Sequence, residues 1–127
     1  MKILIASDHG GFELKSKISL WLKENNYTFV DLGNHKYDPL DDYPDFAIKI
    51  GEAISKGEAK IGILICGSGV GASVTANKIK GVRASVCHDS YSARQGVEHD
   101  DMNILCLGAR VIGEQLAFEL VNAFINA

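Results

Sequence analysis

Short apolar runs alternate along the chain with longer amphipathic segments. The short runs are rich in Ile, Leu and Val, which is typical of strands buried on both faces of a parallel sheet. We expect strands over residues 2–6, 28–32, 61–66, 82–87 and 104–107, and helices over residues 11–25, 44–56, 71–80, 89–98 and 113–125. This alternation predicts an α/β fold, in which a five-stranded parallel sheet lies between two helical layers as a three-layer α/β/α sandwich.

Length and charge narrow the class of protein. A chain of 127 residues has the size of one domain, so we expect residues 1–127 to form a single domain. The net charge of −3 argues against a nucleic-acid surface, which usually carries an excess of Lys and Arg. No segment has the apolar length of a signal peptide or a membrane span, so we expect a cytoplasmic protein that binds no membrane. The three cysteines are widely spaced, which argues against a disulfide framework and a zinc finger.

Polar residues and glycines gather where the expected strands end. In an open parallel sheet, ligands bind beyond the carboxyl ends of the strands. The segments at these ends are Ser7-Asp8-His9-Gly10-Gly11, Asp31-Leu32-Gly33, Cys66-Gly67-Ser68-Gly69, Cys87-His88-Asp89 and Leu107-Gly108-Ala109-Arg110. We therefore place the candidate site at this edge of the sheet.

The segment from Cys66 to Gly71 carries the strongest local signal for chemistry. Its glycines precede an expected helix, so successive N–H groups can form an anion-binding concavity, although the glycines could also simply close a tight turn. The match to a dinucleotide-binding loop is weak, because that loop normally follows the first strand, whereas the glycine loop here follows the third expected strand. Cys66 is either a catalytic thiol whose thiolate form the N–H groups favour, or a small buried hydrophobic residue.

Further candidates flank this loop in the expected fold. Asp8 and His9 follow the first strand and could contact a sugar hydroxyl and a phosphate, although Asp8 could also cap the next helix. Arg110 follows the last strand and is a candidate for a bidentate phosphate contact. Tyr43 either closes over a ligand or packs against the protein. His99 ends the fourth helix, where its protonated form is favoured, and is either a proton donor or a loop histidine in solvent.

Several motifs occur in an order that resembles one enzyme family. They are Ile5-Ala-Ser-Asp8-His9-Gly-Gly-Phe-Glu-Leu-Lys15, Asp42-Tyr43-Pro44-Asp45, Gly62-Ile-Leu-Ile-Cys66-Gly-Ser-Gly-Val-Gly71, Ala76-Asn77-Lys78, Arg83-Ala84, Tyr91-Ser-Ala-Arg94 and Asn103-Ile-Leu-Cys-Leu-Gly-Ala-Arg-Val-Ile-Gly113. Together they resemble ribose-5-phosphate isomerase B over nearly the whole chain. The wider family also contains galactose-6-phosphate and allose-6-phosphate isomerases. The resemblance implies a Rossmann-like sheet and a homodimer, or a dimer of dimers, with a shared active site.

The resemblance also implies a reaction and a role for each candidate residue. The reaction is the interconversion of ribose 5-phosphate and ribulose 5-phosphate in the pentose phosphate pathway, through a cis-enediolate and without metal or organic cofactor. His99 of the partner subunit would open the sugar ring, and Cys66 as thiolate would move a proton between C2 and C1. His9 and Arg110 would hold the phosphate. Sugar hydroxyls would be oriented by Asp8, Tyr43 and Ser68, and the enediolate oxygen would face the N–H groups of Gly67, Ser68, Gly69, Val70 and Gly71.

The chain departs from the family pattern in three respects, one of which is Val97 in place of an arginine. The family's usual Ser-Arg-Glu-His-Asn is Gly96-Val97-Glu98-His99-Asp100 here. Asp100 stands where an amide normally supports the enediolate oxygen, and a carboxylate would repel that oxygen unless it is protonated. Family members also commonly continue into an arginine-bearing tail, whereas this sequence stops at Ala127. Two alternatives stay open: isomerisation of a six-carbon sugar phosphate such as allose or galactose 6-phosphate, and a catalytically weakened sugar-phosphate binding protein.

Overall fold

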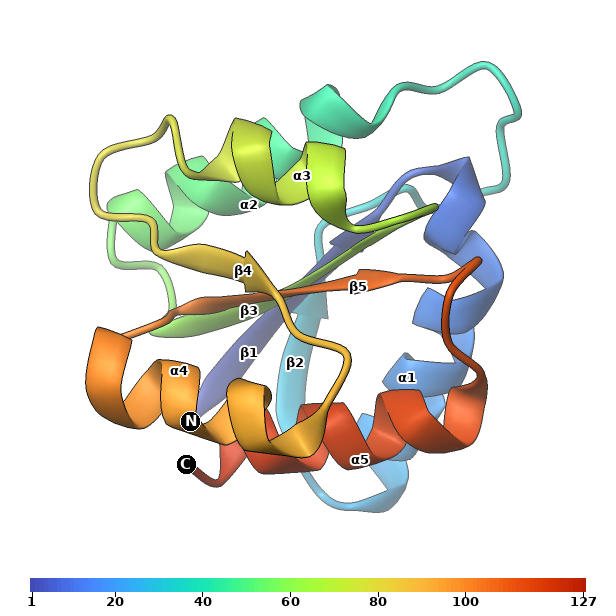
Figure 1. Cartoon of the computed structure of the whole chain (residues 1–127). Coiled ribbons are helices and arrows are strands. Elements are labelled where there is room, and N and C mark those ends of the chain that lie inside the picture. The colour runs from blue at the N-terminus through green and yellow to red at the C-terminus, as the bar shows by residue number, and fades with distance from the viewer.

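The computed structural model describes all 127 residues and is built around one five-stranded parallel sheet (Figure 1). The strands are β1 (Lys2–Ser7), β2 (Thr28–Asp31), β3 (Ile61–Cys66), β4 (Ala84–Val86) and β5 (Ile104–Gly108), in the order β2-β1-β3-β5-β4. The helices are a 3₁₀ turn η1 (His9–Gly11), α1 (Phe12–Glu24), α2 (Tyr43–Ser55), α3 (Val70–Ala76), α4 (Ser90–Asp100) and α5 (Glu114–Ile125). The predicted α/β fold with a parallel sheet is confirmed.

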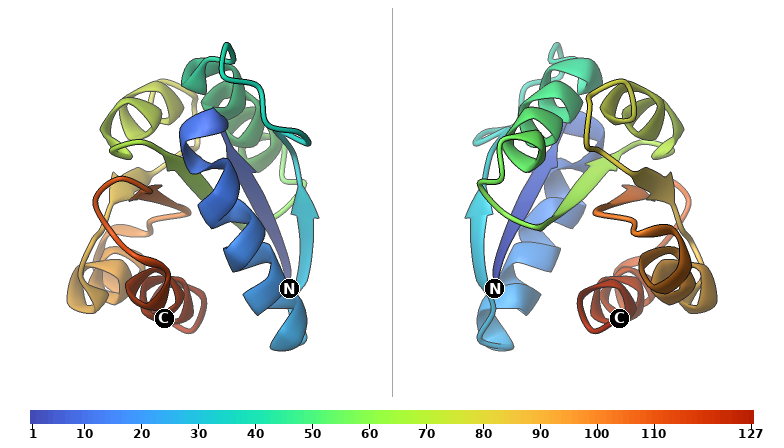
Figure 2. Two further views of the ribbon diagram at one scale, coloured as in Figure 1. Left: turned by 90° about the vertical axis from the view of Figure 1, so that its right-hand side faces the viewer. Right: turned by 90° about the vertical axis from the view of Figure 1, so that its left-hand side faces the viewer.

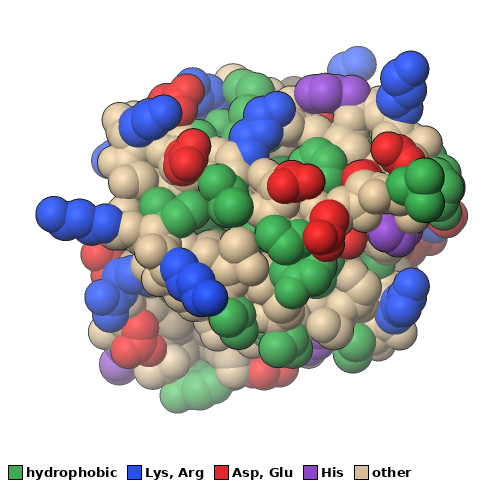
Figure 3. Space-filling view, turned by 90° about the horizontal axis from the view of Figure 1, so that it is seen from above, with side chains coloured by type: hydrophobic (Ala, Val, Ile, Leu, Met, Phe, Trp, Pro, Cys, Tyr) green, Lys and Arg blue, Asp and Glu red, His purple; other side chains and the backbone are tan.

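Helices cover both faces of the sheet, which makes the predicted three-layer sandwich (Figures 1 and 2). α2 and α3 pack together on one face, and α1, α4 and α5 cover the other. The longest helices have 13 residues, and none is both long and apolar enough to cross a membrane. The outer surface on the α2–α3 side mixes apolar patches with acidic and basic side chains (Figure 3).

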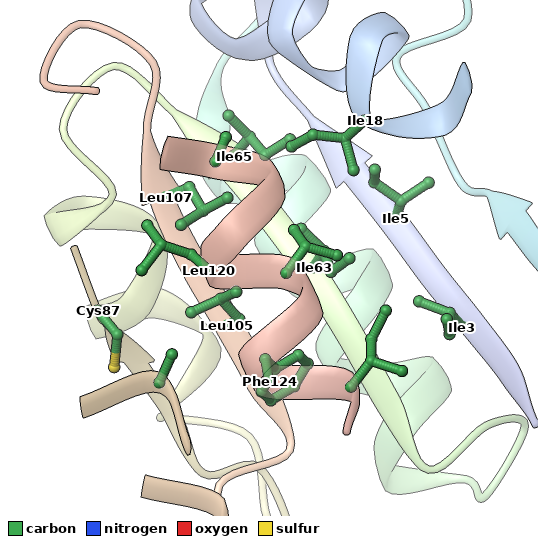
Figure 4. Close-up of a cluster of buried hydrophobic side chains, with 14 of the residues drawn as sticks. Ile3, Ile5, Ile18, Ile63, Ile65, Cys87, Leu105, Leu107, Leu120 and Phe124 are labelled. Carbon is green, nitrogen blue, oxygen red and sulfur yellow. The ribbon is translucent and has the colours of Figure 1, made fainter. Parts of the chain in front are cut away.

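Each face of the sheet has its own hydrophobic core. Alternate residues of a strand point to opposite faces, so Ile3 and Ile5 of β1 join the core under α1 and α5, whereas Leu4 joins the core under α2 and α3. Figure 4 shows the first of these cores, in which Leu120 and Phe124 of α5 lie over the central strands. Both faces of the sheet are therefore buried, and a ligand can reach only its edges and the ends of its strands.

The register of the central strands brings three strand ends to the same edge. Ser7 of β1 lies beside Ile65 of β3, and Cys66 of β3 lies beside Gly108 of β5. The loops that follow β1, β3 and β5 therefore leave the sheet side by side. This is the edge at which the polar and glycine segments were predicted to gather.

Two predicted elements are three residues shorter in the structure, whereas the bounds of the other elements differ by at most two residues. α3 ends at Ala76 rather than at residue 80, and β4 spans residues 84–86 rather than 82–87. The side chain of Asn77 accounts for the early end of α3, because it accepts the N–H of Ala84 at 2.7 Å and donates to the carbonyl oxygen of Ala84 at 2.8 Å. Bonds of this kind compete with continuation of a helix and here tie the chain after α3 to β4.

Candidate active site

A cavity of about 510 Å³ opens at the carboxyl edge of the sheet. Its wall contains nine residues that the sequence analysis selected: Asp8, His9, Tyr43, Cys66, Gly67, Ser68, Val70, Gly71 and Arg110. Gly10 and Val111 complete the wall. The buried Gly69 does not line the cavity, and His99 and Asp100 lie elsewhere. The fold therefore assembles most of the predicted site within one chain.

Cys66 is the last residue of β3 and is 5% exposed in the cavity wall. The backbone N–H of Gly69 donates a hydrogen bond to its Sγ at 3.1 Å. Gly69 has a φ of +82°, a left-handed conformation that most other residues adopt only at a cost. The loop thus aims a donor at the sulfur, where it would stabilise negative charge.

The remainder of the glycine loop makes packing contacts and hydrogen bonds within the chain. The N–H of Val70 donates to Ser68 Oγ at 3.2 Å, so two of the five expected backbone donors, those of Gly69 and Val70, already have partners within the chain. Gly71 lets the Tyr43 ring approach, since a Cβ at Gly71 would lie only 2.6 Å from Tyr43 Cζ. Tyr43 therefore packs on the start of α3 and also lines the cavity.

Asp8 caps the turn that follows β1 and also lines the cavity. Its Oδ1 accepts the N–H of Gly11 at 3.2 Å. Burial raises the pKa of the Asp8 carboxyl above its usual value, while the bond from Gly11 and the charge of His9 act against this rise. The carboxyl group is therefore held in a fixed position and its proton is more easily retained than in solvent.

Arg110 is brought over the glycine loop by the backbone after β5. The N–H of Ala109 donates to the carbonyl oxygen of Cys66 at 2.9 Å, and the N–H of Arg110 donates to that of Gly67 at 3.0 Å. A Cβ on Gly67 would lie 3.6 Å from Cδ and Nε of Arg110, so the side chain passes closely across the loop. No carboxylate lies within ion-pair distance of Arg110, and its charge is available to a ligand.

His9 pairs with a carboxylate that the sequence analysis missed. Asp41 Oδ1 accepts the main-chain N–H of His9 at 2.8 Å and lies 2.7 Å from the ring Nδ1. This hydrogen bond raises the pKa of His9, and desolvation acts in the opposite direction. Asp41 lies in the polar loop before α2, 32 residues from His9, and no local pattern links the two.

The ligand atoms of Asp8, His9 and Asp41 lie within 4.8 Å of one another, a spacing that a metal ion could use. Hydrogen bonds within the chain already engage these atoms. Gly11 donates to Asp8, His9 donates to Asp41 Oδ1, and Asn34 donates to Asp41 Oδ2 at 2.7 Å. A metal ion would have to displace the proton between His9 and Asp41. We therefore interpret the group as a hydrogen-bonded pair beside a carboxyl group rather than as a metal centre.

Lys15 is a second residue that the sequence analysis missed. Its hydrogen bonds hold the loop behind the cavity in place. Although it is 2% exposed, its Nζ donates to both carboxylate oxygens of Asp31 at 2.7 and 2.8 Å and to the carbonyl oxygen of Asn34. A buried ammonium group needs partners of this kind. Its position three residues before Ile18, on the buried side of α1, is the signal that could have identified it.

His99 and Asp100 lie at the other end of the sheet from Cys66. They end α4, and the carbonyl oxygen of Asn103, shortly afterwards, accepts the N–H of Gly62 near the start of β3. Cys66 is four residues further along β3, which is about 13 Å at the usual rise of a strand. The His99 and Cys66 side chains of one chain therefore do not share a cavity.

His88 and the other two cysteines have structural positions. His88 Nε2 accepts the N–H of Gly108 at 3.0 Å, and burial lowers the pKa of His88. Cys87 and Cys106 are 5% and 0% exposed, and burial raises the pKa of both thiols. Both are core residues, and Cys66 is the one thiol in the cavity wall.

A thiol, a carboxyl group and two basic side chains around one cavity are suited to acid–base chemistry on a small anionic substrate. The family described as ribose/galactose isomerase matches residues 3–127. The solved structure of ribose-5-phosphate isomerase B from Clostridium thermocellum has a TM-score of 0.96 and 50% identity, covering 100% of this chain and 85% of that chain. The enzyme from Mycoplasma genitalium, solved with bound ribulose-5-phosphate, has a TM-score of 0.94 and 42% identity, covering 99% of this chain and 84% of that chain.

A third relative carries a different substrate in its name. It is D-erythrulose-4-phosphate isomerase from Pectobacterium atrosepticum, 38% identical over 130 aligned positions that cover 100% of this chain and 84% of the relative. The fold and the relatives thus place the chain among the aldose–ketose isomerases. The chain belongs to the ribose/galactose isomerase family, as the resemblance to ribose-5-phosphate isomerase B predicted.

Proposed function

We propose that this protein interconverts ribose 5-phosphate and ribulose 5-phosphate. The observation that carries the proposal is the Cys66 thiol, which receives an N–H hydrogen bond in a cavity that also contains two basic side chains. Aldose–ketose isomerisation needs a base at carbon and positive charge for the phosphate, and these groups supply both. The bound ribulose 5-phosphate of the M. genitalium relative supports the same class of ligand here.

The proposed reaction begins with the open-chain aldose. Cys66 as thiolate removes the C2 proton, and the electron pair moves onto O1 to give a cis-enediolate. Return of the proton to C1, with transfer of the hydroxyl proton from O2 to O1, gives the ketose. The loop N–H groups of Gly67, Ser68 and Gly71 face the enediolate oxygen, since those of Gly69 and Val70 already have partners within the chain, and donors aimed in this way each contribute about 10²–10³ in rate. His9 and Arg110 hold the phosphate, and hydroxyls are oriented by Asp8, Tyr43 and Ser68.

The ring-opening step needs a second copy of the chain. About 13 Å of β3 separates Cys66 from the end of the sheet where His99 lies. Val70, Val74 and Val111 are 56%, 55% and 62% exposed at or near the cavity, and this apolar surface suits a second copy. We therefore propose a homodimer, in which His99 of the partner subunit opens the sugar ring and the partner subunit's Asp100 lies near the enediolate oxygen. The expectation of a cytoplasmic protein stays part of this proposal.

A complementation experiment tests the shared site. Cys66→Ala and His99→Asn are each expected to abolish most isomerisation when they are assayed alone. Subunits mixed in equal amounts after denaturation and refolding form heterodimers in half of the dimers, and each heterodimer has one intact site out of two. The mixture should therefore regain about a quarter of wild-type activity, as a symmetric dimer requires. Two variants that stay inactive after mixing would contradict a site shared between subunits.

Exchange of the C2 hydrogen of ribose 5-phosphate with solvent deuterium, followed by NMR, tests the reaction itself. Cys66→Ala is expected to lower exchange about a thousandfold or more, the loss typical of removing an essential base. Cys87→Ala is the matched control, because Cys87 is also a thiol beyond a strand end but lies outside the cavity. Saturable binding of ribose 5-phosphate by the wild-type protein without exchange would instead establish the binding-protein alternative.

The length of the sugar is a separate question, which the same assay answers. The D-erythrulose-4-phosphate isomerase among the relatives and the ribose/galactose description of the family make four-carbon and six-carbon substrates the comparators. We expect kcat/KM to be highest for ribose 5-phosphate. A higher value for allose 6-phosphate or galactose 6-phosphate would replace the five-carbon assignment with the six-carbon one.

A further inference from the structure

We propose that Asp41 is a positioning residue that keeps the His9 ring doubly protonated, with its Nε2–H directed to the substrate phosphate. The proposal rests on the phosphate-binding role given to His9 above. It concerns a residue that makes no contact with the cavity itself and acts through its hydrogen bonds to His9.

The side chains of His9 and Asp41 lie at different places relative to the cavity. His9 lines the cavity beside Cys66 and Arg110, whereas Asp41 lies behind it and lines a separate hollow next to Asn34. The Asp41 carboxylate is 10% exposed and the His9 ring 30%. Because Asp41 Oδ1 engages both the main-chain N–H and the ring Nδ1 of His9, only Nε2 of the ring remains for a ligand.

The protonation state of the ring then decides whether the phosphate can bind. A carboxylate only accepts hydrogen bonds, so the ring must carry its proton on Nδ1 to bond Asp41. A neutral ring in this tautomer would present a bare lone pair at Nε2. A phosphate dianion also only accepts, so the two would repel. The imidazolium presents an N–H at Nε2 and adds a positive charge, which makes the bond possible and strong.

The surroundings of His9 mostly favour its charge. The hydrogen bond to Asp41 is the largest influence that raises the pKa of His9, and the nearby Asp8 carboxyl adds to it, whereas desolvation lowers it. Arg110 lies in the same cavity wall and opposes protonation, but it also attracts the phosphate. Tyr37 packs edge-on against the ring, with 6.3 Å between the ring centroids.

Asp41 is itself fixed by a buried polar network. Its Oδ2 accepts the side-chain amide of Asn34 at 2.7 Å, and Asn34 is 7% exposed. The carbonyl oxygen of Asn34 is bonded by Lys15, which also holds Asp31. A loop carboxylate that is held on both oxygens keeps one orientation, and it therefore fixes both the tautomer and the direction of the His9 ring.

Asp41→Asn removes the charge and keeps the shape. The Asn oxygen can still accept both His9 N–H groups, and the amide of Asn34 can turn over to pair with the new amide. Asp38→Asn is the matched control, because it makes the same charge change in the same loop, where the Asp38 carboxylate accepts only the N–H of Leu40. Thermal melts of both variants verify that they fold.

Two measurements decide the proposal independently of catalysis. NMR titration of the His9 ring should show protonation moving to lower pH in Asp41→Asn and staying at the wild-type pH in Asp38→Asn. Binding of inorganic phosphate at about pH 7.5 should weaken about tenfold in Asp41→Asn, the lower limit for losing a hydrogen bond to a charged group. At about pH 5.5, where histidine is largely protonated even at its ordinary value, the two proteins should bind phosphate equally. Because the wild-type protein and Asp41→Asn are compared at the same pH, the ionisation of phosphate itself affects both affinities equally.

Kinetics with ribose 5-phosphate give the third readout. KM should rise about tenfold in Asp41→Asn at about pH 7.5, while kcat stays within about threefold, because the phosphate is bound equally in ground and transition states. An unchanged His9 titration, or an affinity loss of the same size at both pH values, would overturn the proposal. If the wild-type protein fails to isomerise ribose 5-phosphate, the function proposed above fails, and the NMR and phosphate measurements still decide the role of Asp41.

Discussion

Gly71→Ala should displace the Tyr43 ring while the fold loses only part of its stability. The added methyl group would lie 2.6, 2.7 and 2.8 Å from Cζ, Oη and Cε1 of Tyr43. Ordinary carbon contacts are about 3.5–4.0 Å, so the ring must retreat by about 1 Å. Overpacking costs about 1–3 kcal/mol, and alanine in a helix recovers up to about 1 kcal/mol relative to glycine. The net loss in the free energy of unfolding should therefore be at most about 3 kcal/mol, or about 12 °C in Tm at ~4 °C per kcal/mol.

The loss of activity should be much larger than this change in stability suggests. A displacement of about 1 Å in a positioning group can lower the rate a hundredfold, so we expect kcat/KM for ribose 5-phosphate to fall ten- to a hundredfold. Gly113→Ala is the control, because a Cβ at Gly113 would meet nothing within 4 Å. In a Tyr43→Ala background there is no ring to displace, and Gly71→Ala should then change kcat/KM by less than about threefold. An equal loss in both backgrounds would refute the reasoning.

Three further predictions follow from single contacts. Gly69→Ala should lower the free energy of unfolding by about 1–2 kcal/mol in urea titrations, because the left-handed φ of Gly69 is strained for alanine, and an unchanged value would contradict this. The pKa of His88 is lowered in the folded protein, so the unfolded chain takes up this proton first. Stability should therefore be full above about pH 6.5 and decline as the pH falls below it, more in the wild type than in His88→Gln. Asp100→Asn should raise kcat, since an amide can donate to the enediolate oxygen, and the substitution spares the bond from Arg83 Nε because this bond ends on the Asp100 backbone oxygen. An unchanged or lower kcat would show that the carboxylate is tolerated or used.

Sequence patterns predicted those parts of the structure that local order determines. The apolar runs of β1, β3 and β5 are continuous because both faces of the sheet are covered, and this alone indicates parallel strands. Parallel strands place their carboxyl ends at one edge, which is why Asp8, Cys66 and Arg110 were expected together and line one cavity. The end of α3 was missed because the side chain of Asn77 bonds the backbone of β4, and a helical pattern alone does not report such a contact.

The residues that set the charge of the site were harder to find. Lys15 contacts Asp31 across 16 residues, and Asp41 contacts His9 across 32 residues. Neither pair follows a periodicity, and an aspartate in a polar loop is normally assumed to be solvated. The fold nevertheless places each carboxylate against a basic side chain, and a charge held in this way changes what its neighbour can bind. A motif can therefore mark His9 as a candidate phosphate ligand, whereas the hydrogen bond to Asp41 that raises the pKa of His9 is a contact that only the folded chain makes.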